Sequence, residues 1–294
     1  AADQLPVLMA EEHRGDPATS SLKYERDVYF DKPGTDIIVN GSAYAPGGRP
    51  AKEVLVGLRV GGLDKVLKVK GDRVYEKGAS GVRPTPVSAF VQVPLEYERA
   101  YGGTDTQDPD PAKHVAFFPN PLGVGHARRP EHLVGKAAPN VEFPDKPMRA
   151  DRAAGLGALG NHWLPRRLYA GTYDDEWQAN RRPLLPHDYD HRWNMCAPID
   201  QQIEPHWSGT GTVRLTNLTA KGHLELVLPP VRLKYLTEFY PVANREPMEL
   251  RPKLHTVVLE PDEGRVIAVW HGRFVCGRSL ENIEHTLVVE EPRG

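Results

Sequence analysis

Apolar and polar residues alternate over several short stretches early in the chain, a pattern typical of β-strands. The alternation is clearest from Glu53 to Val60, and in residues 65–70 we expect the apolar side chains on one face and the lysines on the other. Gly71-Asp72 predicts a hairpin turn into the next short strand. The other strands predicted in this part are Asp27 to Phe30, Thr35 to Tyr44, Arg73 to Glu76 and Ala89 to Tyr97.

The same kind of pattern returns after residue 210. Pro261-Asp262-Glu263-Gly264 lies between two apolar runs and predicts a tight turn. We therefore predict a mainly β protein, in which the N- and C-terminal parts form antiparallel, sandwich-like sheets. The strands predicted in the C-terminal part are Gly211 to Leu218, His223 to Leu228, Leu254 to Leu259, Val266 to Trp270 and Ile283 to Val289.

Residues 98–207 interrupt this pattern with many prolines, glycines and aromatic residues. A structureless loop of that length is unusual in a compact domain, so residues 98–140 are either an ordered excursion packed over the sheets or a functional surface. We predict a single domain over residues 1–294, made of an N-terminal β half (22–97), this loop-rich insert with one or two short helices, and a C-terminal β half (208–290).

One short helix is predicted within the insert. Thr172 can cap its N-terminus, and Asp174 and Asp175 then fall in the first turn, where the helix dipole favours negative charge. Arg181 and Arg182 close the last turn, and the proline that follows them stops the helix.

Charge and hydropathy exclude several classes of partner. The chain has 294 residues and a formal net charge of −2, which gives no electrostatic drive toward nucleic acid or an anionic membrane. No apolar run approaches the length of a membrane span, and no secretory signal pattern is visible. The sequence therefore predicts a cytoplasmic protein without a nucleic-acid or membrane partner.

The cysteines and histidines give weak signals for catalysis or metal binding. Cys196 and Cys276 form no CxxC pair, which excludes a disulfide framework, and we expect two reduced, mostly buried thiols. A nucleophilic Cys196 with Asp200 can be drawn, but no nucleophile motif supports it. His187-Asp188-Tyr189-Asp190-His191 resembles a ligand set, yet prolines upstream disfavour a regular helix and no HExxH motif is present. We predict no catalytic residue, cofactor or metal.

Gly155-Leu156-Gly157-Ala158-Leu159-Gly160 has the spacing of a dinucleotide-binding loop. Such a loop must follow a strand and open a helix, so that a pyrophosphate can sit on free backbone N–H groups. Neither element is predicted beside it. A nucleotide site is therefore not expected.

The stretch from Gly155 to Gln202 is crowded with tryptophan, tyrosine and arginine. These residue types are enriched at the hot spots of protein interfaces, although internal packing with arginine–aspartate pairs would use the same residues. We take this stretch as the candidate partner-binding site. Its candidate residues are Trp163, Arg166, Arg167, Tyr173, Trp177, Arg182, Asp188, Asp190, Arg192 and Trp193.

Six segments together resemble a bacterial domain of unknown function that is encoded beside type VI secretion spike and toxin genes. The segments are Asp27 to Tyr44, Tyr97 to Gly103, Asn120 to Gly125, His162 to Arg167, Pro183 to Asp190 and Ala197 to Gln202. The resemblance covers roughly Leu22 to Val289. It implies a cytoplasmic, non-enzymatic effector adaptor or chaperone, which binds a toxin effector and helps to load it onto the VgrG or PAAR spike.

A second function stays open beside this one. A β-sandwich can carry a carbohydrate-binding module or a hydrolase, with Trp163, Trp177 and Trp193 as a sugar-stacking platform and Asp188 or Asp190 as polar partners. That hypothesis predicts a concave pocket with convergent carboxylates and a perturbed pKa.

Overall fold

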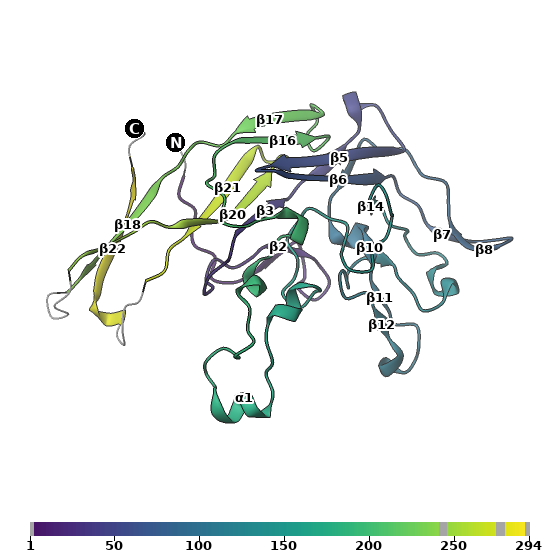
Figure 1. The fold of residues 1–294 in the computed structure, drawn as a ribbon. Coiled ribbons are helices and arrows are strands. Elements are labelled where there is room, and N and C mark those ends of the chain that lie inside the picture. Colours follow the sequence, from purple (N-terminus) through teal and green to yellow (C-terminus); the bar gives the residue numbers. More distant parts are fainter. Residues whose placement is uncertain (1–2, 241–245, 275–279, 292–294) are drawn as a thin grey trace.

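A computed structural model describes residues 3–240, 246–274 and 280–291 of the chain (Figure 1). The fold is mainly β with mostly antiparallel sheets, which confirms the predicted class. Cys276 lies outside the described residues, so the prediction for its thiol is not addressed.

The largest sheet has five antiparallel strands, and its centre is the hairpin formed by β5 (Glu53–Val60) and β6 (Leu63–Lys70). Alternate residues of β5 are buried, as its sequence pattern predicts. The complete strand order is β14 (Val141–Glu142), β6, β5, β16 (Thr212–Thr216) and β17 (His223–Val227). Strands from the N-terminal part, the insert and the C-terminal part therefore share one sheet.

The second sheet has four strands, and β3 (Thr35–Val39) pairs in parallel with β20 (Lys253–Glu260) at its centre. The outer strands are β15 (Gln202–Ile203) and β21 (Arg265–His271), both antiparallel to their neighbours. The predicted turn at residues 261–264 does join β20 to β21. A parallel pair needs a long connection, and here the whole insert lies between the two strands.

The two sheets pack face to face around one hydrophobic core (Figure 1). Val56 and Leu58 of β5 belong to the same buried cluster as Ile37 of β3 and Val257 of β20. The other face of the four-stranded sheet is also covered, because Ile38 and Val258 pack in a second cluster whose other members are Leu22, Ala158, Cys196 and Ala197. The Gly155–Gln202 stretch therefore forms a third layer.

A three-stranded sheet extends to one side of this body, at the left of Figure 1. Its order is β19 (Met248–Leu250), β18 (Leu233–Phe239) and β22 (Ile283–Glu290). Short strand pairs complete the β structure: β1 (Glu12–His13) with β2 (Leu22–Tyr24), β4 (Ser42–Tyr44) with β9 (Gln92–Pro94), β7 (Tyr75–Gly78) with β8 (Gly81–Pro84), β10 (Tyr101–Gly102) with β13 (Val124–Gly125), and β11 (Thr104–Asp105) with β12 (Val115–Ala116).

The helical elements are short. Within the residues that the structure describes there is one α-helix, α1, which spans Asp175–Asn180. The 3-10 helices are η1 (Pro46–Gly48), η2 (Tyr97–Arg99), η3 (Pro111–Lys113), η4 (Pro130–Leu133), η5 (Arg166–Tyr169), η6 (His191–Asn194), η7 (Ile199–Gln201) and η9 (Leu280–Asn282).

Residues 98–140 are ordered by short strand pairs and by a buried asparagine. The side-chain amide of Asn120 donates hydrogen bonds to the backbone oxygens of Tyr97 (2.8 Å) and Tyr101 (3.2 Å). These bonds tie the excursion to η2 at its beginning. A buried amide that donates to backbone oxygens in this way can hold a loop that has little regular secondary structure.

Two of the sequence-based predictions for the N-terminal part are wrong, and a third is only partly right. Asp27 to Phe30 is irregular, and Tyr29 instead stacks on His255 and His271. The predicted hairpin at Gly71-Asp72 does not form, because β6 pairs with β5 and β14 while β7 pairs with β8. Within Ala89 to Tyr97 only β9 is a strand.

The predicted separation of lysines from apolar residues in β6 is also wrong at two positions, and one of these is Val66, which is 41% exposed on the face that carries Lys68 and Lys70. Lys65 lies on the buried face together with Leu67 and Val69. Period-2 alternation requires this placement, since residues i, i+2 and i+4 share a face of a strand. The buried ammonium group needs partners, and the insert supplies them.

Candidate functional site

Residues 170–190, which we call the arm, project from the β body and carry α1 at their tip, and we call residues 163–169, which lead into it, the base of the arm (Figure 1). Asp174 caps α1, because its carboxylate accepts a hydrogen bond from the backbone N–H of Trp177 (2.9 Å). The predicted cap, Thr172, has another role. Its backbone N–H and hydroxyl both donate to the carboxylate of Asp188, at 2.9 and 2.8 Å, which ties the two ends of the arm together.

Contacts between residues of the arm itself stabilise its tip. The rings of Tyr173 and Trp177 meet edge to face at 4.7 Å, and the indole N–H of Trp177 donates to the backbone oxygen of Leu184 (2.8 Å). These contacts leave Tyr173 53% exposed and Leu184 62% exposed, while Leu168 at the base of the arm is 70% exposed. We call Leu168, Tyr173 and Leu184 the arm surface.

The base of the arm contains two of the predicted binding residues, and both are buried. Arg166 is 3% exposed and donates to the backbone oxygens of Leu159 (2.7 Å) and Trp193 (2.8 Å), and it forms an ion pair with Glu25. Trp163 is 1% exposed and packs against Tyr97. Trp163 therefore presents no ring face to a sugar or a partner in this structure, and the proposed three-tryptophan platform is not formed.

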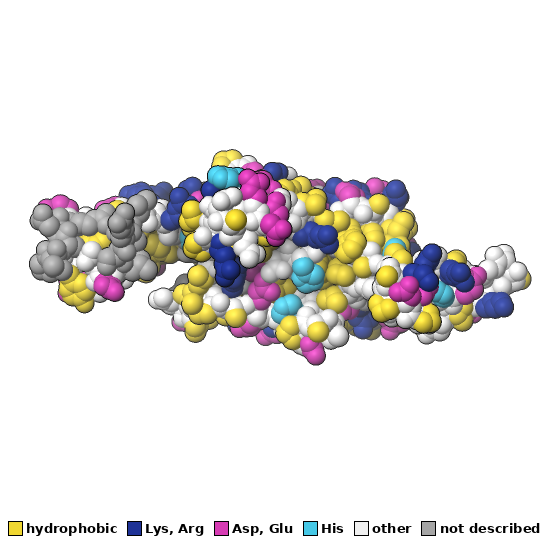
Figure 2. Space-filling model, turned by 90° about the horizontal axis from the view of Figure 1, so that it is seen from below, with side chains coloured by type: hydrophobic (Ala, Val, Ile, Leu, Met, Phe, Trp, Pro, Cys, Tyr) yellow, Lys and Arg dark blue, Asp and Glu magenta, His cyan; other side chains and the backbone are white. Residues whose placement is uncertain are grey.

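The remaining predicted residues lie on or near the surface. Arg167 stacks over Phe118 (4.7 Å), and Arg192 stacks over Tyr169 (4.4 Å) while pairing with Asp190 (2.5 Å). Trp177, Asp190 and Trp193 are partly buried, and the exposed members of the set are Arg167, Tyr173, Arg182, Asp188 and Arg192. Seen from the side on which α1 projects, acidic, basic and hydrophobic side chains are mixed over the surface (Figure 2).

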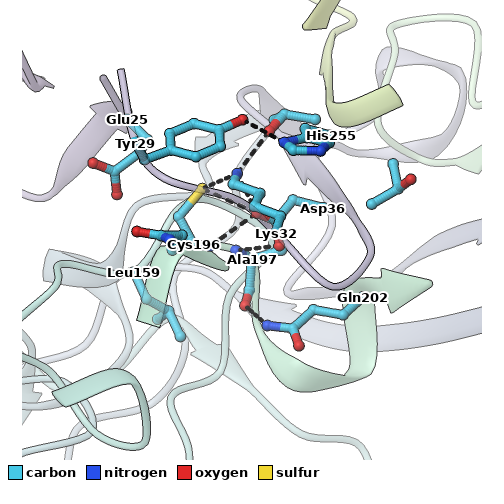
Figure 3. Close-up of polar contacts among 12 residues, drawn as sticks. Glu25, Tyr29, Lys32, Asp36, Leu159, Cys196, Ala197, Gln202 and His255 are labelled. Atoms are coloured by element: carbon cyan, nitrogen blue, oxygen red, sulfur yellow. Dashed lines mark hydrogen bonds and ion pairs between the residues drawn. The ribbon is translucent and has the colours of Figure 1, made fainter. Parts of the chain in front are cut away.

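A buried ion pair anchors the insert to the four-stranded sheet (Figure 3). The Lys32 ammonium lies 2.7 Å from the Asp36 carboxylate and also donates to Thr256 (2.8 Å). Asp36 accepts hydrogen bonds from the backbone N–H groups of Cys196 (2.9 Å) and Ala197 (3.1 Å). Burial alone lowers the pKa of Lys32, but the groups around it, chiefly Asp36 and also Cys196 and Tyr29, together outweigh that effect and hold the pKa above its usual value.

A second anchor joins the end of the insert to both sheets. The side-chain amide of Gln201 donates to the backbone oxygens of Ile37 (2.7 Å) and Leu156 (2.9 Å). Lys65 of β6 donates to Asp200 (2.7 Å) and to the side-chain oxygen of Gln201 (2.8 Å). Burial lowers the pKa of Lys65 to about 8, against the opposing effect of Asp200.

The glycines of the sequence from Gly155 to Gly160 allow aromatic rings to pack against the backbone. A Cβ added at Gly155 would lie 2.2 Å from the ring of Tyr97, and one at Gly160 would lie 2.9 Å from the indole nitrogen of Trp163. The Tyr97 hydroxyl also donates to the backbone oxygen of Gly157 (2.9 Å). These glycines let two buried rings approach the backbone closely, which explains the motif without a phosphate.

The cysteine and histidines of the insert that were considered for catalysis or metal binding do not lie in surroundings that suit those roles. Burial raises the pKa of the Cys196 thiol well above its usual range, although Lys32 opposes the shift, so the thiol stays protonated. His187 lies 3.1 Å from Arg181, and His191 packs edge-on against Tyr189. Neither histidine belongs to a group of potential metal ligands found among the described residues.

A hollow of about 280 Å³ in the arm contains carboxylates beside Trp177. The carboxylate of Asp188 is engaged by Thr172, whose hydrogen bonds lower the pKa of Asp188, and that of Asp174 caps α1. A general acid needs a raised pKa, which these contacts do not provide for Asp188. The lining residues include Thr172, Asp174, Glu176, Trp177, Leu184 and Asp188.

The fold and the site are those of a mainly β protein. Its loop-rich insert covers one face of the four-stranded sheet, and the arm projects from this insert. The chain belongs to a bacterial family, described as "Uncharacterized protein conserved in bacteria (DUF2169)", whose model matches residues 1–271. The matched region contains both packed sheets, the anchors and the arm, whereas β22 lies beyond it. No curated protein and no solved structure matches the chain.

Within residues 3–240, 246–274 and 280–291, no helix is both long enough and apolar enough to cross a membrane.

The anchor residues Glu25, Lys32 and Asp36 were not among the sequence-based candidates. A signal for the ion pair does exist, since Asp36 stands directly before the apolar run Ile37 to Val39 and Lys32 precedes it by four positions. A charge in a buried strand requires a partner, and that requirement could have directed attention to Lys32.

Proposed function

We propose that this protein is a type VI secretion effector adaptor, which binds a toxin effector in the cytoplasm and helps to load it onto the VgrG or PAAR spike. In this role it acts by binding and has no catalytic site. The proposal combines the sequence resemblance described above with one structural observation, the arm and its exposed apolar surface.

The arm has the properties expected of a contact element for another protein. Large apolar side chains exposed on a braced element lose little conformational freedom when they bind, because neighbouring contacts already hold the backbone. Tyr173 is held by Trp177, and the backbone at Leu184 is held by the same indole. The buried anchors then fix the base of the arm on the β body.

The experiment is a binding titration between the purified full-length chain and the toxin encoded beside its gene. Leu184→Asp places a charge on the arm surface, and we expect at least a tenfold loss of affinity, which is a typical effect at an interface hot spot. Leu55→Asp is the matched control. Leu55 is 50% exposed, on the outer face of the five-stranded sheet and away from the arm.

Binding by the wild type and by Leu55→Asp, with loss in Leu184→Asp, supports the proposal. Equal loss in both variants would indicate a general effect of added charge and would count against the arm. The adaptor function itself fails if the wild-type chain binds neither the toxin nor the spike protein, and if deleting the gene leaves toxin secretion unchanged.

A further inference from the structure

Outside the arm, a cluster of imidazole rings surrounds one carboxylate at an edge of the four-stranded sheet. Its members are Asp31, in the loop before β3, His255 on β20, and His271 at the end of β21. One potential ligand atom from each of the three lies within 4.8 Å of the others, and the His255 Nε2 atom is 3.6 Å from Asp31. Asp31 is far from the other two in sequence, whereas His255 and His271 lie on the neighbouring strands of one hairpin.

We propose that Asp31, His255 and His271 form a binding site for a divalent transition-metal ion such as Zn²⁺. Two imidazoles with one carboxylate form a ligand set that suits zinc or iron and is unsuited to Mg²⁺ or Ca²⁺, which prefer oxygen ligands. Ligand atoms around a tetrahedral zinc ion lie about 3.3 Å apart, given bond lengths of about 2.0–2.2 Å. The His255 Nε2 atom and the Asp31 carboxylate, 3.6 Å apart, are already close to that spacing. The ring of His271 is stacked on that of His255, so it must turn for both rings to direct a nitrogen at one ion.

The backbone places His255 for this role. The register of β20 on β21 shifts between Leu254 and Thr256, so that His255 has no partner residue on β21, as in a β-bulge. Bulges redirect a side chain and are common beside functional sites. His255 is 1% exposed and stacks on the ring of His271 with 4.8 Å between centroids.

A neighbouring hydroxyl can hold the ring of His255 in the orientation that a metal requires. The Tyr29 hydroxyl lies 3.1 Å from Nδ1 of His255 (Figure 3). The other ring nitrogen, Nε2, is therefore left for Asp31, which lies 3.6 Å from it. Metal-bound histidines commonly donate their second ring N–H to such a partner, and this contact fixes the tautomer. A third imidazole, His206, stacks on His255 at 4.9 Å, and its Nε2 is buried without a hydrogen-bond partner.

Positively charged side chains also lie near the three proposed ligands, and they limit the affinity of the site for a metal ion. Lys32 lies near His255, but its charge is paired with Asp36 at 2.7 Å. Lys253 and Arg273 act on the imidazoles from exposed positions, where solvent and salt screen them. Asp31 supplies the negative charge that the ion requires.

The test uses the full-length chain after treatment with a chelator, with Zn²⁺ in calorimetry and Co²⁺ as a spectroscopic substitute. We expect one equivalent to bind, visible Co²⁺ absorption typical of low coordination number, and no binding of Mg²⁺ or Ca²⁺. His271→Ala and Asp31→Asn should each weaken binding at least tenfold. Circular dichroism establishes that each variant is folded, and Asp31→Asn preserves the side-chain volume.

His285→Ala is the matched control. His285 belongs to a second group of potential ligands, with Glu238 and Glu284, on the three-stranded sheet. Unchanged binding in this variant supports the proposal. Loss of binding in His285→Ala, retained binding in His271→Ala, or no binding by the wild-type chain would each overturn it. The result does not depend on the adaptor function, since no effector enters the assay.

Discussion

The anchoring ion pair allows a quantitative prediction about the stability of the fold. Lys32 and Asp36 are almost fully buried and lie 2.7 Å apart, so removing one charge leaves the other without compensation. We expect Lys32→Met and Asp36→Asn each to lower the free energy of unfolding by about 3–5 kcal/mol. In Asp36→Asn the amide group also replaces an acceptor that serves the backbone N–H groups of Cys196 and Ala197.

The double variant separates the effect of charge from the effect of shape. With both charges removed, no buried charge is left unpaired, and the loss of stability should be close to that of one single variant rather than the sum of the two. Urea denaturation followed by circular dichroism gives the free energies, and amide hydrogen exchange at Cys196 and Ala197 reports on the anchor itself. Single variants that cost less than about 1 kcal/mol, or strictly additive losses, would refute the reasoning.

Two further predictions concern other buried residues. Burial lowers the pKa of Lys65 from 10.5 to about 8. Between pH 8 and pH 10.5 the unfolded chain therefore binds more protons than the folded chain. The free energy of unfolding should rise over this pH range by about 3 kcal/mol in total. Urea titrations at several pH values should show this rise in the wild type but not in Lys65→Met, and parallel curves would disprove it. Gly155→Ala should lower the free energy of unfolding by about 1–3 kcal/mol in the same assay, because the added Cβ would clash with Tyr97. Gly157→Ala, whose Cβ would lie 3.7 Å from that ring, should be tolerated. Equal losses of stability in the two variants would exclude this explanation.

The sequence predicted those elements whose signals are local. Strict alternation predicted β5, and apolar runs on either side of a strong turn predicted the hairpin of β20 and β21. The acidic first turn predicted α1, although the cap is Asp174 rather than Thr172. In each case the pattern lies within one short stretch of the chain, so no information about distant partners is needed.

The remaining features depend on contacts between distant segments. Trp163 and Tyr173 belong to the same aromatic stretch, yet one is buried under the insert and the other is exposed on the arm. Residue type cannot separate these outcomes, because aromatic residues favour both cores and interfaces. The cluster of Asp31, His255 and His271 was missed for a related reason, since its members form no spacing motif along the chain.

The parallel pairing of β3 with β20 also has a consequence for the synthesis of the protein. β3 leaves the ribosome early, but the strand that covers one of its edges is made only after the five-stranded sheet and the insert. A nascent chain that ends before residue 253 therefore has an uncovered strand edge and an incomplete core, two features that favour aggregation. We expect truncation before β20 to yield insoluble chains, because the translation of β20 is the step that allows the core to close.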